Sequence, residues 1–376
     1  MSTSDPAPLR TTPLRAVHEG LGATMTGFAG WLMPLRYRSE TAEHQAVRNA
    51  AGLFDLSHMG EIAVTGPGAP AALDYALVGR LSAVAPGRAK YTMICAPDGG
   101  VLDDLIVYRL ADAEYLVVAN AANTATVTAA LRDRAAGHEA EVRDQTDEYA
   151  LIAIQGPHAA RILGPLTDIS LDGVKYYSGH RCTVAGQPVL LARTGYTGED
   201  GFELFTVPDG VEALWAALAG AGAGDGLVPA GLAARDTLRL EAGMPLYGNE
   251  LSAELTPFDA GLGRVVVFDK PGDFVGRAAL AERAQAPPRR VLAGLIADSR
   301  RVPRHGYPVT WDGVSRGTVT SGAPSPTLAV PIAMAYLDPE AAERARDDGV
   351  GRLAVDIRGR PEPARMTDLP FYRRPR

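Results

Sequence analysis

Two adjacent aspartates stand in a run of otherwise apolar residues, GGVLDDLIVY (99–108). Because side chains alternate between the two faces of a strand, Asp104 shares a face with Tyr108, and Asp103 lies on the opposite face. At least one carboxylate is therefore expected to be half-buried, which is costly without a partner. Such a group therefore marks a candidate functional site. A structural carboxylate with satisfied hydrogen bonds is the alternative, since ion-pair networks also perturb buried acids.

A glycine-rich turn lies further along the chain, in the sequence TGYTGEDGFE (194–203). Glycines allow the backbone to approach a ligand closely. Tyr196 offers a flat face for stacking, and Glu199 and Glu203 offer carboxylates. Taken alone, however, this segment is more typical of an acidic hairpin turn.

A third set of charged residues lies on a predicted helix within residues 231–243. Arg235 and Arg239 are four residues apart and so share one face of that helix, with Asp236 between them. Solvent-facing ion pairing is the ordinary interpretation, and it stays open for Arg239.

Secondary-structure signals indicate which elements carry these groups. Ser39 as an N-cap, Glu40 in the first turn and Gly52 as a stop predict a helix from Ser39 to Gly52. The turn sequence 96–100 predicts a hairpin of strands 91–95 and 101–108, so the aspartate pair lies on its second strand. Further expected elements are strands 115–120, 150–154, 189–194 and 202–206, and helices 124–136, 157–163 and 211–219.

The order of these elements favours α+β lobes, because strands and helices mix without the regular alternation of a parallel sheet. Residues 285–290 (QAPPRR) predict a linker. Short strands expected beyond it predict a small β-barrel or sandwich. They are 291–296, 317–320, 332–337 and 353–357.

Composition and missing motifs exclude several classes of protein. The 376 residues carry a net charge of −7, which argues against nucleic-acid binding, since that needs a basic face. No apolar run approaches the roughly 18 residues of a membrane span, and the first dozen residues lack a secretory signal. P-loop, GxSxG and HExxH motifs do not occur, so nothing indicates nucleotide phosphate chemistry, serine hydrolysis or metal-dependent hydrolysis. No metal is expected. Cys95 and Cys182 lie far apart without a CxxC partner, which indicates a reduced, cytoplasmic setting.

Seven segments, in order and at family spacing, resemble the aminomethyltransferase (T protein) family of the glycine cleavage system. The resemblance runs from about Pro13 to Tyr372. It includes the aspartate strand and TGYTGEDGFE already described. The other segments are FAGWLMP (28–34), GLFDLSHM (52–59), AARDTLRLEAGMPLYGNE (233–250), TSGAPSPT (320–327) and LPFY (369–372).

The resemblance implies a three-domain cloverleaf, with two ferredoxin-like α+β lobes, a C-terminal β-barrel and folate in a central channel. The expected domains are 1–265, which holds both lobes, and 286–376, which forms the barrel. The second lobe, roughly residues 53–140, is expected to be inserted in the first.

The resemblance also implies a reaction. An aminomethyl group passes from the lipoyl arm of the carrier (H) protein to tetrahydrofolate, giving 5,10-methylenetetrahydrofolate, ammonia and dihydrolipoyl carrier. Two alternatives share the fold: a stand-alone folate-dependent demethylase, and a non-enzymatic folate-binding factor for iron–sulfur assembly. The second normally carries Lys-Gly-Cys-Tyr followed by Gly-Gln-Glu, whereas this chain reads TGYTGED.

Carried over residue by residue, the family's catalytic aspartate falls on Asp104. Its folate-binding positions fall on Tyr91, Tyr108, Val118, Asn120, Tyr196, Glu203 and Arg235, with Tyr176 as a further contact. Arg358 and Arg373 are candidates for holding the folate glutamate tail. The expected partners are tetrahydrofolate as acceptor substrate and the H protein, with no nucleic acid, membrane or metal. The enzyme is expected to be a cytoplasmic monomer.

The chemistry of folate suits these residue types. The pterin edge presents an amino group and a ring N–H side by side, and a carboxylate such as Glu203 can accept both hydrogen bonds. Folate N10 is a weakly basic arylamine that needs no deprotonation before attack. Asp104 is therefore predicted to stabilise cationic character at the one-carbon centre as an iminium forms. It could also orient N10 or take its proton after attack.

Overall fold

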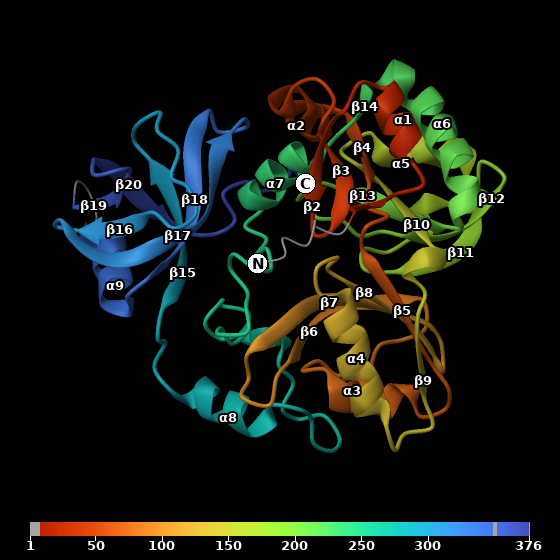
Figure 1. Ribbon diagram of the computed structural model, residues 1–376, viewed down its shortest axis with the longest axis horizontal. Helices are drawn as coiled ribbons and strands as arrows, with labels where there is room; N and C mark the ends of the chain where they lie inside the picture. The colour runs from red at the N-terminus through yellow and green to blue at the C-terminus, as the bar shows by residue number, and fades with distance from the viewer. Residues whose placement is uncertain (1–7, 349–351, 376) are drawn as a thin grey trace, which may run out of the picture.

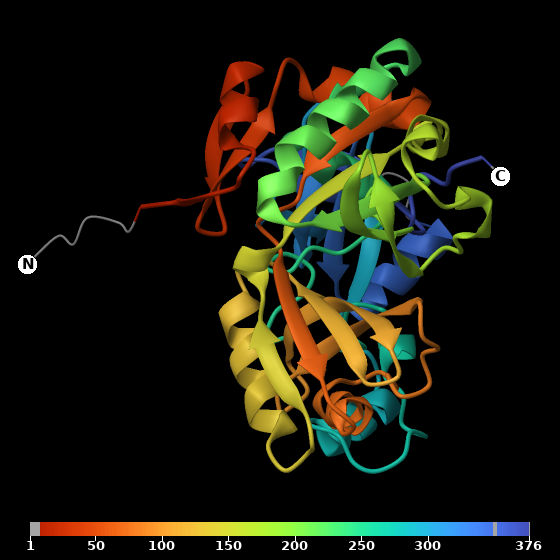
Figure 2. The same ribbon diagram turned by 90° about the vertical axis from the view of Figure 1, so that its right-hand side faces the viewer.

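The computed structural model describes residues 8–348 and 352–375, and it has three parts: two α+β lobes and a β-barrel (Figure 1). Figure 2 shows the same lobes turned by 90°, with the first lobe again directly above the second. Among the described residues, no helix has the length and apolar character needed to cross a bilayer. The α+β expectation with a C-terminal barrel is confirmed.

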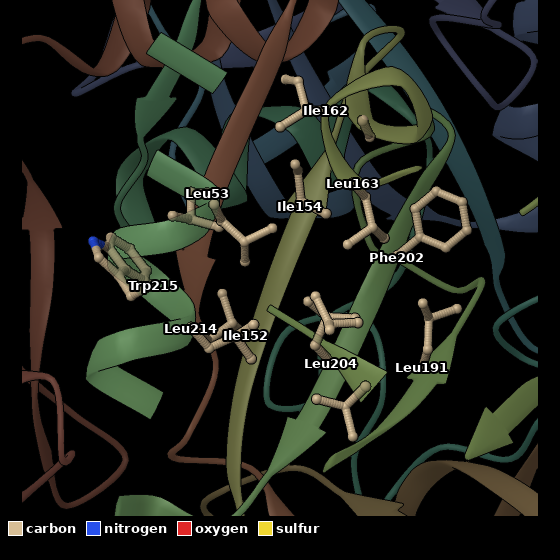
Figure 3. Close-up of a cluster of buried hydrophobic side chains, with 14 of the residues drawn as sticks. Leu53, Ile152, Ile154, Ile162, Leu163, Leu191, Phe202, Leu204, Leu214 and Trp215 are labelled. Carbon is tan, nitrogen blue, oxygen red and sulfur yellow. The ribbon is translucent and has the colours of Figure 1, made fainter. Parts of the chain in front are cut away.

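The first lobe is built on a six-stranded sheet in the order β11-β12-β13-β10-β4-β14. Its strands are β4 (Ala51–Asp55), β10 (Ala150–Gln155), β11 (Gly179–Val184), β12 (Gln187–Ala192), β13 (Gly201–Thr206) and β14 (Leu227–Pro229). Helices α5 (Ala159–Leu163) and α6 (Val211–Gly222) cover one face of the sheet. Figure 3 shows that core, where Ile152 and Leu204 pack with Leu214 and Trp215.

The other face of this sheet points toward the second lobe. Along β10, Ile152 and Ile154 enter the core under α6, whereas Leu151 and Ala153 face the opposite way. Helices α2 (Glu40–Asn49) and α7 (Leu232–Glu241) pack on this inner face. A small sheet of β1 (Arg10–Thr11), β3 (Trp31–Arg36) and β2 (Thr24–Phe28), together with α1 (Arg15–Gly20), completes the lobe.

Between β4 and β10 the chain forms the second lobe, an antiparallel five-stranded sheet in the order β6-β7-β8-β5-β9. Its elements are β5 (Gly60–Thr65), α3 (Ala69–Ala76), β6 (Arg88–Cys95), β7 (Val101–Ala111), β8 (Glu114–Ala119), α4 (Thr124–Ala135) and β9 (Glu141–Asp144). Helices α3 and α4 pack on one face, so the other face is left for the first lobe. The expected domain boundaries stay a proposal, and on these strand limits we place the insert at residues 60–144.

The C-terminal part is a closed barrel in the order β15-β18-β17-β16-β19-β20. Its strands are β15 (Val291–Ala297), β16 (Pro308–Trp311), β17 (Val314–Ser325), β18 (Val330–Leu337), β19 (Leu353–Asp356) and β20 (Pro361–Thr367). Helix α8 (Arg277–Gln285) precedes the expected linker, and α9 (Pro339–Asp348) follows β18.

Helix α7 joins the first lobe to the barrel through a buried acid, Glu241. This carboxylate accepts hydrogen bonds from Ser325 at 2.5 Å and Thr327 at 2.7 Å in the barrel. Within the lobe it pairs with Arg48 at 2.9 Å and His44 at 3.1 Å. Burial acts to raise the pKa of Glu241, but these hydrogen bonds outweigh it and lower the pKa to about 2. The barrel is therefore fixed against the helix that carries Arg235.

One expectation about an individual residue was wrong, and one alternative that the sequence left open is excluded. Gly52 does not end a helix: α2 ends at Asn49, and Gly52 lies in β4, where a Cβ atom would come within 2.4 Å of the Val47 side chain. Arg239 is not solvent-facing, since it is 1% exposed and pairs with Glu250 at 3.0 Å. Its burial results from the barrel, which covers this end of α7 through Ser321.

Candidate active site

A cavity of about 390 Å³ lies where the inner faces of the two lobes meet the loop that follows α7. The structure brings eight of the predicted site residues into its lining. They are Tyr91, Asp104, Tyr108, Val118, Asn120, Tyr196, Glu203 and Arg235. Strand alternation places them there, because Asp104, Ile106 and Tyr108 on β7 face the cavity whereas Leu105 and Val107 pack under α3 and α4.

Asp104 lies on the wall formed by the second lobe. Its carboxylate accepts hydrogen bonds from the Tyr91 hydroxyl at 3.0 Å and from Asn120 Nδ2 at 2.9 Å. Burial raises the pKa of Asp104, and these two hydrogen bonds oppose the rise. The group is thus an acid held in a fixed orientation, with less water around it than an ordinary surface carboxylate.

A second carboxylate, Asp103, is fully buried on the other face of the same strand. It accepts hydrogen bonds from the Asn120 backbone N–H at 2.9 Å, Asn120 Nδ2 at 2.8 Å and Asn123 Nδ2 at 2.6 Å. Burial and the neighbouring charge of Asp104 raise the pKa of Asp103 to about 7. Asn120 therefore bonds both acids and fixes their spacing.

On the first-lobe side of the cavity, Glu203 is buried on β13. It accepts a hydrogen bond from the Thr194 hydroxyl and a longer one, at 3.4 Å, from the Tyr108 hydroxyl. Burial raises the pKa of Glu203, while the Thr194 hydrogen bond and the Arg235 charge oppose that rise. Glu203 can accept further hydrogen bonds from a ligand that enters the cavity.

Arg235 and Tyr196 form a pair beside Glu203. The guanidinium carbon of Arg235 lies 4.8 Å from the centre of the Tyr196 ring, within cation–π range. The Tyr196 hydroxyl donates to the Pro245 carbonyl, in the loop that closes this side of the cavity. The cavity therefore combines two carboxylates, one guanidinium and an apolar and aromatic wall.

Comparisons with known proteins agree with this geometry. Residues 14–270 match the GCVT N-terminal domain, and residues 290–373 match the glycine cleavage T-protein C-terminal barrel domain. The chain belongs to the glycine cleavage T-protein family. The aminomethyltransferase of Streptomyces coelicolor is 66% identical over 97% of this chain and 98% of its own, and that of Saccharopolyspora erythraea is 64% identical over 97% and 98%. These relatives identify the chain as an aminomethyltransferase enzyme.

A solved structure in the T-protein family shares the whole fold. The crystal structure of glycine cleavage system aminomethyltransferase T from Bartonella henselae superposes with a TM-score of 0.90. The two sequences are 36% identical over 97% of this chain and 99% of that one. The three-domain expectation therefore holds for the arrangement as well as for the separate elements.

Three of the predicted T-protein site residues lie outside the cavity lining. Tyr176 is 48% exposed, and its neighbour Tyr177 lines the cavity instead. Arg358 lies exposed in the turn between β19 and β20 of the barrel. Arg373 is exposed near the C-terminus. None of these three side chains is in the lining, although Tyr176 lies near enough to Glu203 for that charge, after burial, to help raise the Tyr176 pKa.

Several cavity residues were missed by sequence reasoning. Tyr177 lies in the turn before β11 and has a left-handed backbone (φ 57°), so no strand alternation indicates where its side chain points. Asn123 was hidden because it is the last residue of the turn before α4, the N-cap position of that helix, rather than part of a strand. His58 and Phe28 lie in quoted family segments, but no spacing argument singled them out. Glu199, which the sequence offered as a carboxylate, pairs with Arg48 at 2.8 Å and lies outside the lining.

Among the described residues, no group of three His, Cys, Asp or Glu side chains could hold a metal ion.

The hydrogen bond from Tyr91 to Asp104 leads to a testable pH dependence. A donor to the ionised carboxylate favours the charged form, so Tyr91→Phe is expected to raise the pKa of Asp104 further. The acid limb of kcat/KM should then move to higher pH by about 1–2 units, since a hydrogen bond to a charged group contributes about 1.5–3 kcal/mol.

The measurement is the kcat/KM profile between about pH 5 and 9. Tyr115→Phe is the matched control, because that tyrosine is buried on the opposite face of the second-lobe sheet. An acid limb that stays in place in Tyr91→Phe would show that ionisation of Asp104 does not govern the profile.

Proposed function

We propose that the chain transfers the aminomethyl one-carbon unit from the lipoyl arm of the H protein to tetrahydrofolate, which binds in the cavity. The observation that carries this proposal is the placement of Glu203 and Asp104 in one cavity on facing lobes. Glu203 is an acceptor that suits the donor pair on the pterin edge, and Arg235 is a donor that suits the ring carbonyl. The residues present therefore fit the folate.

Within this proposal, some side chains bind tetrahydrofolate, and Asp104 stabilises the positive charge that develops during transfer. Tetrahydrofolate supplies the nitrogen atoms that accept the one-carbon unit. Glu203 and Arg235 orient the ring, and Val118 and Tyr108 provide wall around it. Asp104, held by Tyr91 and Asn120, places a negative charge where positive charge develops on the transferred carbon. The same carboxylate can orient the bridge N–H or take its proton.

Because the cavity wall is largely apolar, the single charge of Asp104 is sufficient to stabilise the cationic one-carbon centre. A charge in a site with little water interacts more strongly than it would in bulk solvent. Asp104 is already fixed by two hydrogen bonds, so it needs no reorganisation when charge develops nearby.

The cellular setting is also proposed. Cys95 is buried and Cys182 half-buried, and both are free thiols, which supports a reducing compartment such as the cytoplasm. The monomeric state stays a prediction. The demethylase and iron–sulfur alternatives gain no support, because the relatives at 64–66% identity are aminomethyltransferases.

Replacing Glu203 tests the binding part of the proposal. Glu203→Gln places an amide N–H₂ against donors of the pterin, so the Kd for tetrahydrofolate should rise about 10–100-fold. The turnover at saturating folate should fall much less, because Asp104 is unaffected. Titration calorimetry measures the Kd.

Glu148→Gln serves as the control, because Glu148 is an exposed residue paired with Arg143. If Glu203→Gln bound tetrahydrofolate as tightly as the unaltered enzyme, Glu203 would not be the pterin contact.

A further inference from the structure

A histidine on the cavity wall, His58, has hydrogen-bonding capacity that the protein does not use. It is 2% exposed, and its buried Nδ1 has no hydrogen-bond partner. No residue within 8–348 or 352–375 donates to or accepts from either ring nitrogen. Buried polar groups are normally paired, and an unpaired one costs roughly 1–3 kcal/mol. Nε2 is also unbonded but is not among the fully buried unpaired atoms, so it is the ring nitrogen that a ligand in the cavity can reach.

The turn that carries His58 is held firmly between β4 and β5, where the chain passes from one lobe to the other. The Ser57 N–H donates to Asp55 Oδ1 at 2.9 Å, and Asp55 Oδ2 is bonded to His18 Nε2 at 2.8 Å. The Phe28 ring meets the imidazole edge-on, with 5.7 Å between centroids. The imidazole is therefore set in place before any ligand arrives.

The surroundings of His58 also determine its charge. Burial and the positive charge of Arg235 lower the pKa of His58 to about 4, with Asp55 opposing them. The ring is thus neutral at neutral pH, with one N–H donor and one lone-pair acceptor. A neutral imidazole beside Arg235 suits an uncharged hydrogen-bonding partner.

We propose that His58 accepts a hydrogen bond from a ring N–H of the bound reduced pterin, at N5 or N8. This inference rests on the proposed function. Glu203, which only accepts, suits the amino edge, and Arg235, which only donates, suits the ring carbonyl. Asp104 is assigned to the bridge nitrogen. The ring N–H groups that reduction creates still need an acceptor, and the unpaired imidazole next to Arg235 supplies one.

The test measures equilibrium binding and needs no turnover. His58→Leu should raise the Kd for tetrahydrofolate about 10-fold, because one buried hydrogen bond is lost. His58→Gln, which keeps an acceptor, should stay within about threefold of the unaltered protein. His305→Leu is the matched control, since that exposed histidine lies in the barrel and bonds the Thr320 carbonyl.

Ligand analogues separate a direct contact from a structural effect. The same titrations use 5-deaza- and 8-deaza-tetrahydrofolate, each of which lacks one ring N–H. If His58 bonds that N–H, the analogue binds the unaltered protein more weakly and His58→Leu adds no further loss. An equal loss for tetrahydrofolate and both analogues, or no loss in His58→Leu, overturns the proposal.

A measurement on the unaltered protein covers the case in which His58→Leu does not fold. The ¹⁵N resonance of the acceptor nitrogen of His58 should shift when tetrahydrofolate binds, and an unchanged resonance would refute the contact. A failure of the proposed function would give a different result. In that case the unaltered protein would not bind tetrahydrofolate, or Glu203→Gln would bind it normally.

Discussion

Asp104→Asn is expected to lower turnover by about 10²–10⁴-fold while changing the Kd for tetrahydrofolate by only a few-fold. Asparagine has nearly the same shape as aspartate, so the cavity wall is preserved. It carries no negative charge, however, and cannot stabilise positive charge at the transferred carbon. In the proposed complex, Glu203 and Arg235 hold the pterin, and this substitution leaves both untouched. Ammonia release from aminomethyl-loaded H protein measures turnover, and calorimetry measures affinity.

Asp103→Asn provides the matched control for this result. Asp103 is adjacent in sequence, but it lies on the other face of β7, where its carboxylate accepts hydrogen bonds from Asn120 and Asn123. Because its pKa is raised to about 7, it is partly protonated at neutral pH and already resembles a neutral group. Turnover in Asp103→Asn should therefore fall by less than about tenfold. Normal turnover in Asp104→Asn would remove Asp104 from the mechanism, and equal losses in both variants would indicate a structural role.

Strand alternation made most of the β7 face predictable. A period of two determines that Asp104 and Tyr108 point the same way, and β7 pairs with β6 in regular register from Asp103 to Arg109. The sequence could not tell which face met the cavity. That depends on α3 and α4, which cover Leu105 and Val107 and leave the aspartate face for the first lobe.

Residues outside regular strands were harder to predict. Tyr176 and Tyr177 are neighbours, and the left-handed backbone at Tyr177 reverses which of them lines the cavity. The link between Asp103 and Asn120 joins residues 17 apart across two strands, so it depends on register as well as on pattern. Arg358 and Arg373 were chosen by charge alone, without a motif to locate them. The local sequence pattern was sufficient to predict which strand residues share a face, but not which turn residues line the cavity.

Arg239 shows how tertiary packing can reverse a local interpretation, and it also gives the largest expected effect on stability. Its guanidinium bonds the exposed Asp236 at 2.8 Å, the buried Glu250 at 3.0 Å and Ser321 of the barrel at 2.8 Å. Arg239→Met would leave the Glu250 charge buried without its cation. The free energy of unfolding should fall by about 3–5 kcal/mol, as measured by chemical denaturation.

Asp236→Asn separates the two ion pairs of Arg239. Asp236 is 49% exposed, so the loss of its charge should cost at most about 1 kcal/mol, whereas Glu250 is fully buried. The double variant Arg239→Met with Glu250→Leu should be more stable than the sum of the single changes predicts, because no unpaired charge remains. Arg239→Met should also weaken tetrahydrofolate binding, since Glu250 holds the Leu246 N–H at 2.9 Å in the loop that closes the cavity. If Arg239→Met lowered the free energy of unfolding no more than Asp236→Asn does, the buried pair would not be what holds the barrel, α7 and this loop together.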